Sequence, residues 1–285
     1  MPLHQLLPDV QTLSPEQIEA LQQHIRVDII AVHGLNPWSK PEEEHAFDTW
    51  RKPAGPDGRL WLRDDLKDKT PEARVFLYQY DSKLIWGGDK ASFILKADEF
   101  LEAIRVQRKK VSNTLLRFLL YTGLVFFGTP HDGGDPSLVR IGSVAAKIAR
   151  SLGAQKNHDI EQALQSGSLF TEILKHSFRN QLKRYQIVSF WEGKGDIVPM
   201  KSAIFGLPDD VEYIVELKAT HSDMCRFDTV NDKHDKDLFS TVWGNLEDLY
   251  DKALECGESE NIDTSLTDIR DQSLAERLAA LRSTQ

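Results

Sequence analysis

The stretch Val125-Phe126-Phe127-Gly128-Thr129-Pro130-His131 is an apolar, aromatic run that ends abruptly in Gly-Thr-Pro. Short continuous apolar runs with β-branched and aromatic residues are typical of strands buried on both faces. Gly and Pro end such a strand and begin a turn. The stretch therefore predicts a buried strand from Leu124 to Gly128, whose carboxyl end opens into a loop that carries His131.

Other segments of the same character alternate with segments of helical spacing. The predicted strands are Val27–Val32, Arg74–Tyr80, Gln186–Glu192 and Val211–Leu217. Helices are predicted after Ser14, at Trp61–Leu66, from Phe93 to about Leu120, near 137–152 and 159–183, and at Leu238–Leu254. Strands that alternate with helices form a mostly parallel sheet with helices on both faces. The sequence predicts an α/β fold, a three-layer sandwich around a mostly parallel central sheet.

The length of 285 residues suits one α/β domain with flanking segments. We expect an N-terminal helical extension at 1–26 and the α/β domain at 27–256. The last segment, 257–285, is rich in charged residues and is predicted to form a tail.

The composition of the chain narrows the classes of molecule that the protein could bind. The net charge of −9 argues against a nucleic-acid partner. The chain has two cysteines, Cys225 and Cys256, which give neither a disulfide framework nor metal-ligand spacing. Together with an N-terminus that does not resemble a signal peptide, they favour a reducing, cytoplasmic location. The most apolar stretch, Leu115–Phe127, contains Arg117 and is shorter than the roughly 20 residues of a membrane span. Contact with a membrane surface stays open.

The segment His33-Gly34-Leu35 follows the first predicted strand of the α/β domain. A glycine here allows a tight turn, and the next backbone amide, that of Leu35, can point at a developing oxyanion. One such donor contributes about 3 kcal/mol in a transition state. A plain strand-to-loop turn is the alternative interpretation.

His221 follows the last predicted strand, and ligands of open α/β sheets bind beyond the carboxyl ends of strands. We interpret His221 as a candidate general base, which takes a proton from a nucleophile and returns it to a leaving group. The alternative is a surface histidine that caps a turn with Ser222 and Asp223.

Two acids are candidates for the partner of His221. Glu192 ends the fourth strand, and Asp196 lies in the Gly-rich loop that follows. Either carboxylate could hold the imidazole tautomer and stabilise its charged form. A solvated loop acid or a helix cap is the alternative for each.

Other polar groups give weaker signals. His131 and Asp132 lie in a Gly-rich turn, for which a structural role is favoured over a chemical one. The chain contains no His-x-His or His-Glu-x-x-His spacing, so neither a metal nor another cofactor is predicted.

Several motifs occur in the order found in one family. They are Ile30–Leu35, Phe47–Trp50 with Trp61–Asp64, Arg74–Phe76 with Tyr80–Ser82, Gly123–His131, Ser189–Glu192, Val198–Ala203 and His221–Met224. In this order they resemble the lipase-like α/β-hydrolases of the serine-active-site-containing and inositol-deacylase-like group, many of them fungal. The resemblance covers roughly residues 27 to 250.

The resemblance implies a Ser-acid-His hydrolase of small-molecule or lipid esters, which include lactones. It assigns the general base to His221 and one oxyanion donor to the amide of Leu35. It assigns the acid to Glu192, with Asp196 as the rival.

The chain departs from this family at its nucleophile. No Gly-x-Ser-x-Gly elbow occurs anywhere in the sequence. About 30 residues, the size of a strand with its turn and helix, are missing between Lys110 and Ser112. The serines considered as substitutes, Ser82, Ser112, Ser137 and Ser143, lack the strand–turn–helix with flanking glycines. A skipped segment in the gene model and an evolved pseudoenzyme both explain the gap.

The missing strand would lie in the middle of the sheet, so its loss leaves backbone groups that need new partners. Either the two flanking strands pair directly or the core is incomplete. For function, we expect an impaired or inactive serine ester hydrolase. The alternative is a non-catalytic binding or scaffold protein on the same frame.

Overall fold

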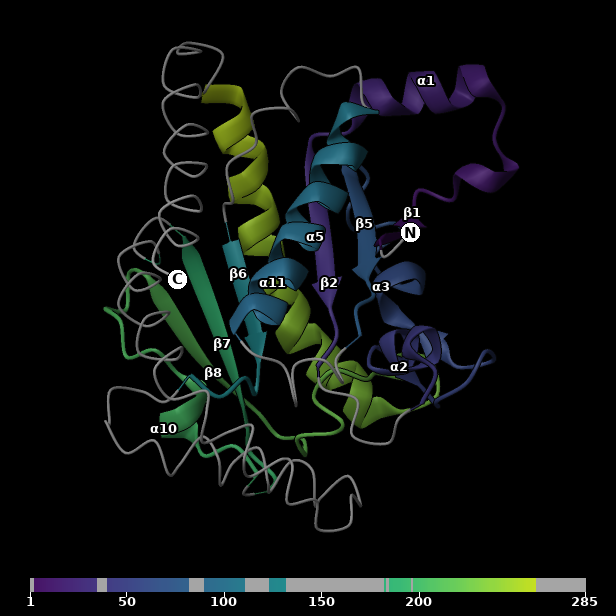
Figure 1. Ribbon diagram of the computed structural model, residues 1–285. Helices are drawn as coiled ribbons and strands as arrows, with labels where there is room; N and C mark the ends of the chain where they lie inside the picture. The colour runs from purple at the N-terminus through teal and green to yellow at the C-terminus, as the bar shows by residue number, and fades with distance from the viewer. Residues whose placement is uncertain are drawn as a thin grey trace.

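The computed structural model describes residues 3–34, 40–81, 90–110, 123–131, 182, 185–195 and 197–259. Helices and strands alternate along this part of the chain, and Figure 1 shows their arrangement. The predicted α/β class is therefore confirmed. The predicted helices near 137–152 and 159–183 and the tail after Ser259 lie outside the described residues.

The first sheet has the order β1-β5-β2, in which β1 is Leu3–Leu7, β5 is Ala73–Tyr78 and β2 is Val27–Val32. Strands β2 and β5 are parallel, whereas β1 pairs with β5 in the antiparallel direction. The predictions of β2 and β5 are confirmed. The sequence analysis did not predict β1, a five-residue run that ends at Pro8 and gives little periodic signal.

The second sheet has the order β6-β7-β8, with all strands parallel. Strand β6 is Gly123–Phe127, β7 is Gln186–Glu192 and β8 is Glu212–Leu217. These bounds confirm the three predicted strands to within a residue at each end. A small hairpin of β3 (Arg51–Lys52) and β4 (Arg59–Leu60) stands apart from both sheets.

The described helices α1, α3, α5 and α11 were predicted and differ in length from the predictions, whereas η1, α2 and α10 were not predicted. Ser14 caps helix α1 (Pro15–His24) with a capping box, because its hydroxyl and the Gln17 side chain each bind the other's backbone amide. The remaining helical elements are η1 (Val10–Thr12), α2 (Glu42–Asp48), α3 (Trp61–Asp64), α5 (Lys90–Lys109), α10 (Met200–Ala203) and α11 (Lys233–Ser259). Helix α11 is longer than the predicted closing helix, since Asp232 caps its first turn.

Alternation along β5 places one helix on each face of the first sheet. Phe76 and Tyr78 pack with Ala103 of α5. Val75 and Leu77 point the other way, into a cluster that contains residues of α11 such as Val242. Successive side chains of a strand point to opposite faces, so α5 and α11 cover opposite faces of this sheet.

The strands that flank the predicted gap, β2 and β6, do not pair with each other. In the described part of the chain, β2 pairs with β5 and β6 pairs with β7, in separate sheets. Both strands run in the same direction in Figure 1. All five residues of β6 are half-buried, whereas every residue of β5 is buried. One continuous three-layer sandwich is therefore not seen among the described residues.

A shared core nevertheless joins the two sheets. One cluster contains Leu77 of β5, Phe190 of β7, Leu217 of β8 and Trp61 of α3. The ring of Trp50 contacts Phe127 of β6 at 5.8 Å between centroids. Side chains of α11 contribute to the same cluster, so this helix spans both sheets. The two sheets are thus packed as one unit although their strands are not hydrogen-bonded to each other.

The described helices were also compared with the requirements of a membrane span. None of them is both long enough and apolar enough to cross a bilayer.

Candidate functional site

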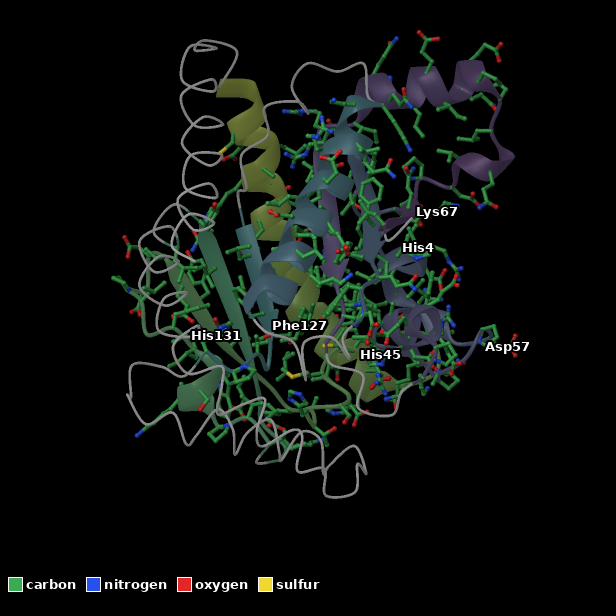
Figure 2. All side chains as sticks on the ribbon, viewed as in Figure 1. His4, His45, Asp57, Lys67, Phe127 and His131 are labelled. Atoms are coloured by element: carbon green, nitrogen blue, oxygen red, sulfur yellow. The ribbon has the colours of Figure 1, made fainter. Side chains whose placement is uncertain are left out.

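The carboxyl ends of the parallel strands lie at one edge of the molecule. His33 follows β2, Tyr80 follows β5, Gly128 follows β6 and Glu192 ends β7. This edge is at the bottom of Figure 1, and Figure 2 shows Phe127, His131 and the helix residue His45 along it. The loop after β8 adds His221 to the same edge, since the backbone amide of His221 donates to Glu192.

His33 is held on both sides of its ring. Its Nδ1 donates to the Gly34 carbonyl at 2.8 Å, and its Nε2 accepts from the Tyr80 amide at 3.2 Å. The Tyr80 hydroxyl donates to the His33 carbonyl at 3.1 Å, and the two rings stack 4.4 Å apart. These contacts select the neutral tautomer with the proton on Nδ1. His33 therefore organises the turn rather than exchanging protons.

The surroundings of His33 keep its ring uncharged. Burial lowers the pKa of His33 to about 4, against the usual value of 6.5. A buried imidazolium loses hydration that this site does not replace. At neutral pH the turn after β2 is thus built on a neutral histidine.

A second histidine supports the same turn from helix α2. His45 Nε2 donates to the Gly34 carbonyl at 3.3 Å, and its ring meets His33 edge-on at 5.0 Å. Burial lowers the pKa of His45, and the charge of Arg226 acts in the same direction. Two imidazoles therefore fix the direction of one carbonyl. His45 was not predicted from the sequence, where its only signal is a histidine in an acidic segment.

Gly128 lets β6 approach the His221 loop closely. Its φ of +54° lies in the left-handed region, and a Cβ there would stand 2.8 Å from Met224 Sδ and 3.0 Å from His221 Nδ1. Any larger residue would collide with both side chains and adopt a strained backbone. The glycine of the opening sequence stretch is explained by this approach.

Glu192 links two loops through its carboxylate. One oxygen, Oε2, accepts from the His221 backbone amide at 3.0 Å, and the other, Oε1, accepts from the Val198 amide. The side chain is buried, with 3% of its surface exposed. The structure thus brings Glu192 to the backbone amide of His221, whereas the predicted contact was with the imidazole ring. These contacts give Glu192 a role in holding the loops.

Substitution of Glu192 by glutamine is expected to lower the free energy of unfolding by about 1–3 kcal/mol, because two amides lose a charged acceptor in a buried place. Urea unfolding measures this loss, and hydrogen exchange at the His221 amide should become faster. The matched control is Glu216→Gln on the neighbouring strand, where the side chain is exposed and a change within about 0.5 kcal/mol is expected. Equal effects of the two substitutions would contradict the linking role.

His221 itself has no hydrogen-bond partner for its buried Nδ1. Burial lowers the pKa of His221 to about 4, so the ring is neutral at pH 7. A general base in a triad normally has a carboxylate on one nitrogen, which fixes the tautomer and stabilises the charged ring. Among the described residues, no carboxylate or hydroxyl is hydrogen-bonded to the His221 ring. The His221 ring therefore lies at this edge without an orienting carboxylate in the described part of the chain.

His131 is packed as a neutral aromatic ring. It stacks on Phe205 at 3.7 Å and meets Phe126 edge-on at 4.5 Å. Burial lowers the pKa of His131 to about 3, and its Nε2 has no partner. Its backbone amide donates to the Ser202 carbonyl at 2.5 Å. This packing agrees with the structural role favoured by the sequence; Asp132 lies outside the described residues.

Two of the described nucleophilic side chains near the site, Ser189 and Cys225, are engaged or suppressed. The Ser189 hydroxyl donates to Glu212 at 2.6 Å within the sheet. Burial raises the pKa of the Cys225 thiol to about 12, which removes the reactive thiolate at neutral pH. The described part of the chain therefore supplies an ordered turn at His33 and Gly34 and a neutral imidazole at His221, and neither Ser189 nor Cys225 is activated as a nucleophile there.

Two of the predicted catalytic positions, Leu35 and Asp196, lie outside the described residues. Their roles remain predictions, as does the choice between Glu192 and Asp196 for the acid. A Cβ at Gly195, the neighbour of Asp196, would stand 2.7 Å from Glu192 Oε2. The loop backbone that leads to Asp196 thus passes close to the Glu192 carboxylate.

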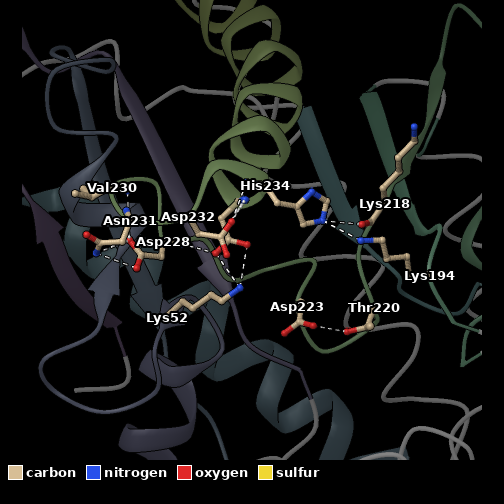
Figure 3. Close-up of polar contacts among 11 residues, drawn as sticks. Lys52, Lys194, Lys218, Thr220, Asp223, Asp228, Val230, Asn231, Asp232 and His234 are labelled. Carbon is tan, nitrogen blue, oxygen red and sulfur yellow. Dashed lines mark hydrogen bonds and ion pairs between the residues drawn. The ribbon is translucent and has the colours of Figure 1, made fainter.

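Figure 3 shows how the loop between β8 and α11 is anchored. The Thr220 hydroxyl donates to Asp223 at 2.6 Å, and Lys52 forms an ion pair with the buried Asp235 at 2.8 Å. The Trp61 indole donates to the Cys225 carbonyl at 2.9 Å. The loop that carries His221 is therefore fixed at both ends and in its middle.

No group of three or more metal-ligating side chains is found among the described residues. The chain was also compared with known proteins. It matches no family model, no curated protein and no solved structure.

Proposed function

We propose that this chain is a lipase-like serine ester hydrolase from which the nucleophile unit is absent, and that it does not hydrolyse esters. On this proposal the two sheets correspond to the two halves of a hydrolase sandwich. The nucleophile strand and helix would stand between β2 and β6. The parallel directions of these strands and their separation into two sheets support the proposal.

The observation that carries the proposal is the unpartnered imidazole of His221. The ring is neutral at pH 7 and its Nδ1 is buried without a hydrogen bond. Among the described residues, this ring has no hydrogen-bonded hydroxyl to activate and no carboxylate to stabilise its charged form. On this proposal, the chain keeps the turn at His33 and Gly34 and the general base His221, and it lacks the nucleophilic serine.

A second candidate function is the binding of an ester or lipid ester without turnover, as a binding or scaffold protein. The hydrogen bonds that fix the Gly34 carbonyl favour it, because they keep the turn ordered without a nucleophile. We further propose a reducing, cytoplasmic location, which the two free cysteines support.

The proposal is tested by the hydrolysis of p-nitrophenyl butyrate. Wild type and His221→Gln should release p-nitrophenol at the same rate within twofold, close to that of buffer. A positioned general base contributes about 10²–10⁴-fold. A wild-type rate 100-fold above that of the variant would therefore show that the chain is an active hydrolase. Equal melting temperatures of the two proteins exclude unfolding as the cause of a difference.

A further inference from the structure

Arg226 has an unusual set of neighbours for an arginine in an acidic protein. Seven other arginines in the described part of the chain have a carboxylate oxygen within 4.0 Å. Arg226 forms no ion pair there, and its Nε is buried without a hydrogen-bond partner. Arg226 as a whole is half-buried, but a buried N–H donor without an acceptor is costly, and acids that could accept from it are in excess in this chain. The absence of an acceptor for the Arg226 Nε among the described residues therefore needs a physical reason.

The position of Arg226 connects it to the candidate site. It lies five residues after His221 in the same loop, where its own amide donates to the Asp223 carbonyl at 3.0 Å. The preceding carbonyl, that of Cys225, is held by the Trp61 indole. On its other side, the Arg226 charge reaches His45, whose ring binds the Gly34 carbonyl. Arg226 thus belongs to the His221 loop, and its charge acts on a residue that supports the turn after β2.

We propose that Arg226 is the binding residue for an oxyanion group, a carboxylate or a phosphate, on a ligand held at this edge of the sheet. The inference rests on the proposed function insofar as the ligand occupies the same site. A guanidinium presents its N–H donors in a plane that matches carboxylate and phosphate oxygens. The ligand supplies the acceptor that Arg226 lacks in the free protein. The preferred ligands are therefore acidic, or are esters that carry a separate negative group.

The test compares wild type with Arg226→Met, a substitution that keeps much of the side-chain volume and removes the charge. Without ligand, the melting temperature of Arg226→Met should equal or exceed that of wild type, because a buried donor without a partner is removed. A fall of several degrees would mean that the guanidinium stabilises the fold itself, and would overturn the proposal. Arg63→Met, at an exposed Arg–Asp pair, serves as the control for loss of one surface charge.

The ligand arms use sodium butyrate, inorganic phosphate and the neutral ester methyl butyrate, each against sodium chloride of equal ionic strength. Butyrate or phosphate should raise the melting temperature of wild type and of Arg63→Met. The dissociation constant should increase about 10- to 100-fold in Arg226→Met, as for the loss of a charge-assisted hydrogen bond. Whether butyrate or phosphate binds shows whether the oxyanion group of the ligand is a carboxylate or a phosphate.

The same arms separate this inference from the proposed function. If neither anion shifts the melting temperature, or if the shift persists in Arg226→Met, the role of Arg226 is wrong. In that case, an equal rise in the melting temperatures of wild type and Arg226→Met with methyl butyrate would still support ester binding. Conversely, the anions could bind in a way that depends on Arg226 while methyl butyrate has no effect. That result would support the Arg226 site and contradict ester binding.

Discussion

Substitution of Asp28 by asparagine is expected to lower the free energy of unfolding by about 3–5 kcal/mol, the usual cost of breaking a buried ion pair at one partner. Asp28 on β2 binds Arg74 on β5 through both oxygens, at 2.8 and 2.9 Å. Both side chains are almost fully buried, with 3% and 5% of their surfaces exposed. Arg74 also donates to the Gln107 carbonyl of α5, so the pair joins two strands and a helix.

The matched control for Asp28→Asn is Glu102→Gln. Glu102 binds Arg105 on the surface of α5, and each side chain is about half exposed. A solvent-exposed pair of this kind contributes little to stability, because water and salt screen it. Urea unfolding should show a lower midpoint for Asp28→Asn with an unchanged slope, and almost no shift for Glu102→Gln. Similar small shifts in both variants would contradict the burial of the first pair.

Acidification is expected to destabilise the protein through its neutral histidines, with His33 as the clearest case. The pKa of His33 is about 4 in the folded protein and 6.5 in the unfolded chain. As the pH falls below 6.5, the unfolded chain takes up the proton first, which favours unfolding. The stabilisation by neutral His33 is therefore complete above pH 6.5 and is lost as the pH falls towards 4. At about 1.4 kcal/mol per pKa unit, the loss is about 3 kcal/mol.

The pH prediction is checked by urea unfolding of wild type and His33→Gln at pH 7.5 and pH 4. Between these two conditions the variant should lose about 3 kcal/mol less stability than wild type, since glutamine does not titrate. The other acid-sensitive groups are common to both proteins, so they cancel in the comparison. Parallel pH profiles for wild type and His33→Gln would contradict the prediction.

The strands of the parallel sheets were predictable because they are buried on both faces. Such strands have continuous apolar runs, and the predictions for β2 and β7 agree with the structure at both ends. β1 could not be predicted, because its five residues pair only through contacts with β5, far along the chain. Helix α11 begins before the apolar segment that predicted it, since its first turn is set by the Asp232 cap.

The sequence predicted which residues lie at the candidate site, but it did not predict which atoms of these residues contact one another. The motif order placed His33, Glu192 and His221 at strand ends, where the structure has them. The contact of Glu192 with the His221 backbone, in place of its ring, depends on loop geometry that residue types do not encode. His45 and Arg226 were missed for a related reason. Their roles come from packing between distant segments, α2 and the loop before α11.

If the chain is the hydrolase that we propose, the division of the sheet explains why its candidate groups do not form a complete site. Of the two outcomes expected for the missing strand, direct pairing of the flanking strands is not seen among the described residues. The shared core holds the two sheets together without joining β2 to β6. The turn after β2 and the His221 loop are therefore supported from their own sides, by Tyr80 and His45 and by Glu192, respectively.

The central claim, a hydrolase frame without a nucleophile, is tested most directly by a covalent serine probe. The full chain is incubated with a fluorophosphonate and its intact mass is measured, with an active serine esterase labelled in the same tube. We predict that the mass of this chain is unchanged while the esterase is fully modified. A single adduct on this chain that maps to one serine, and that is lost in His221→Gln, would contradict the claim.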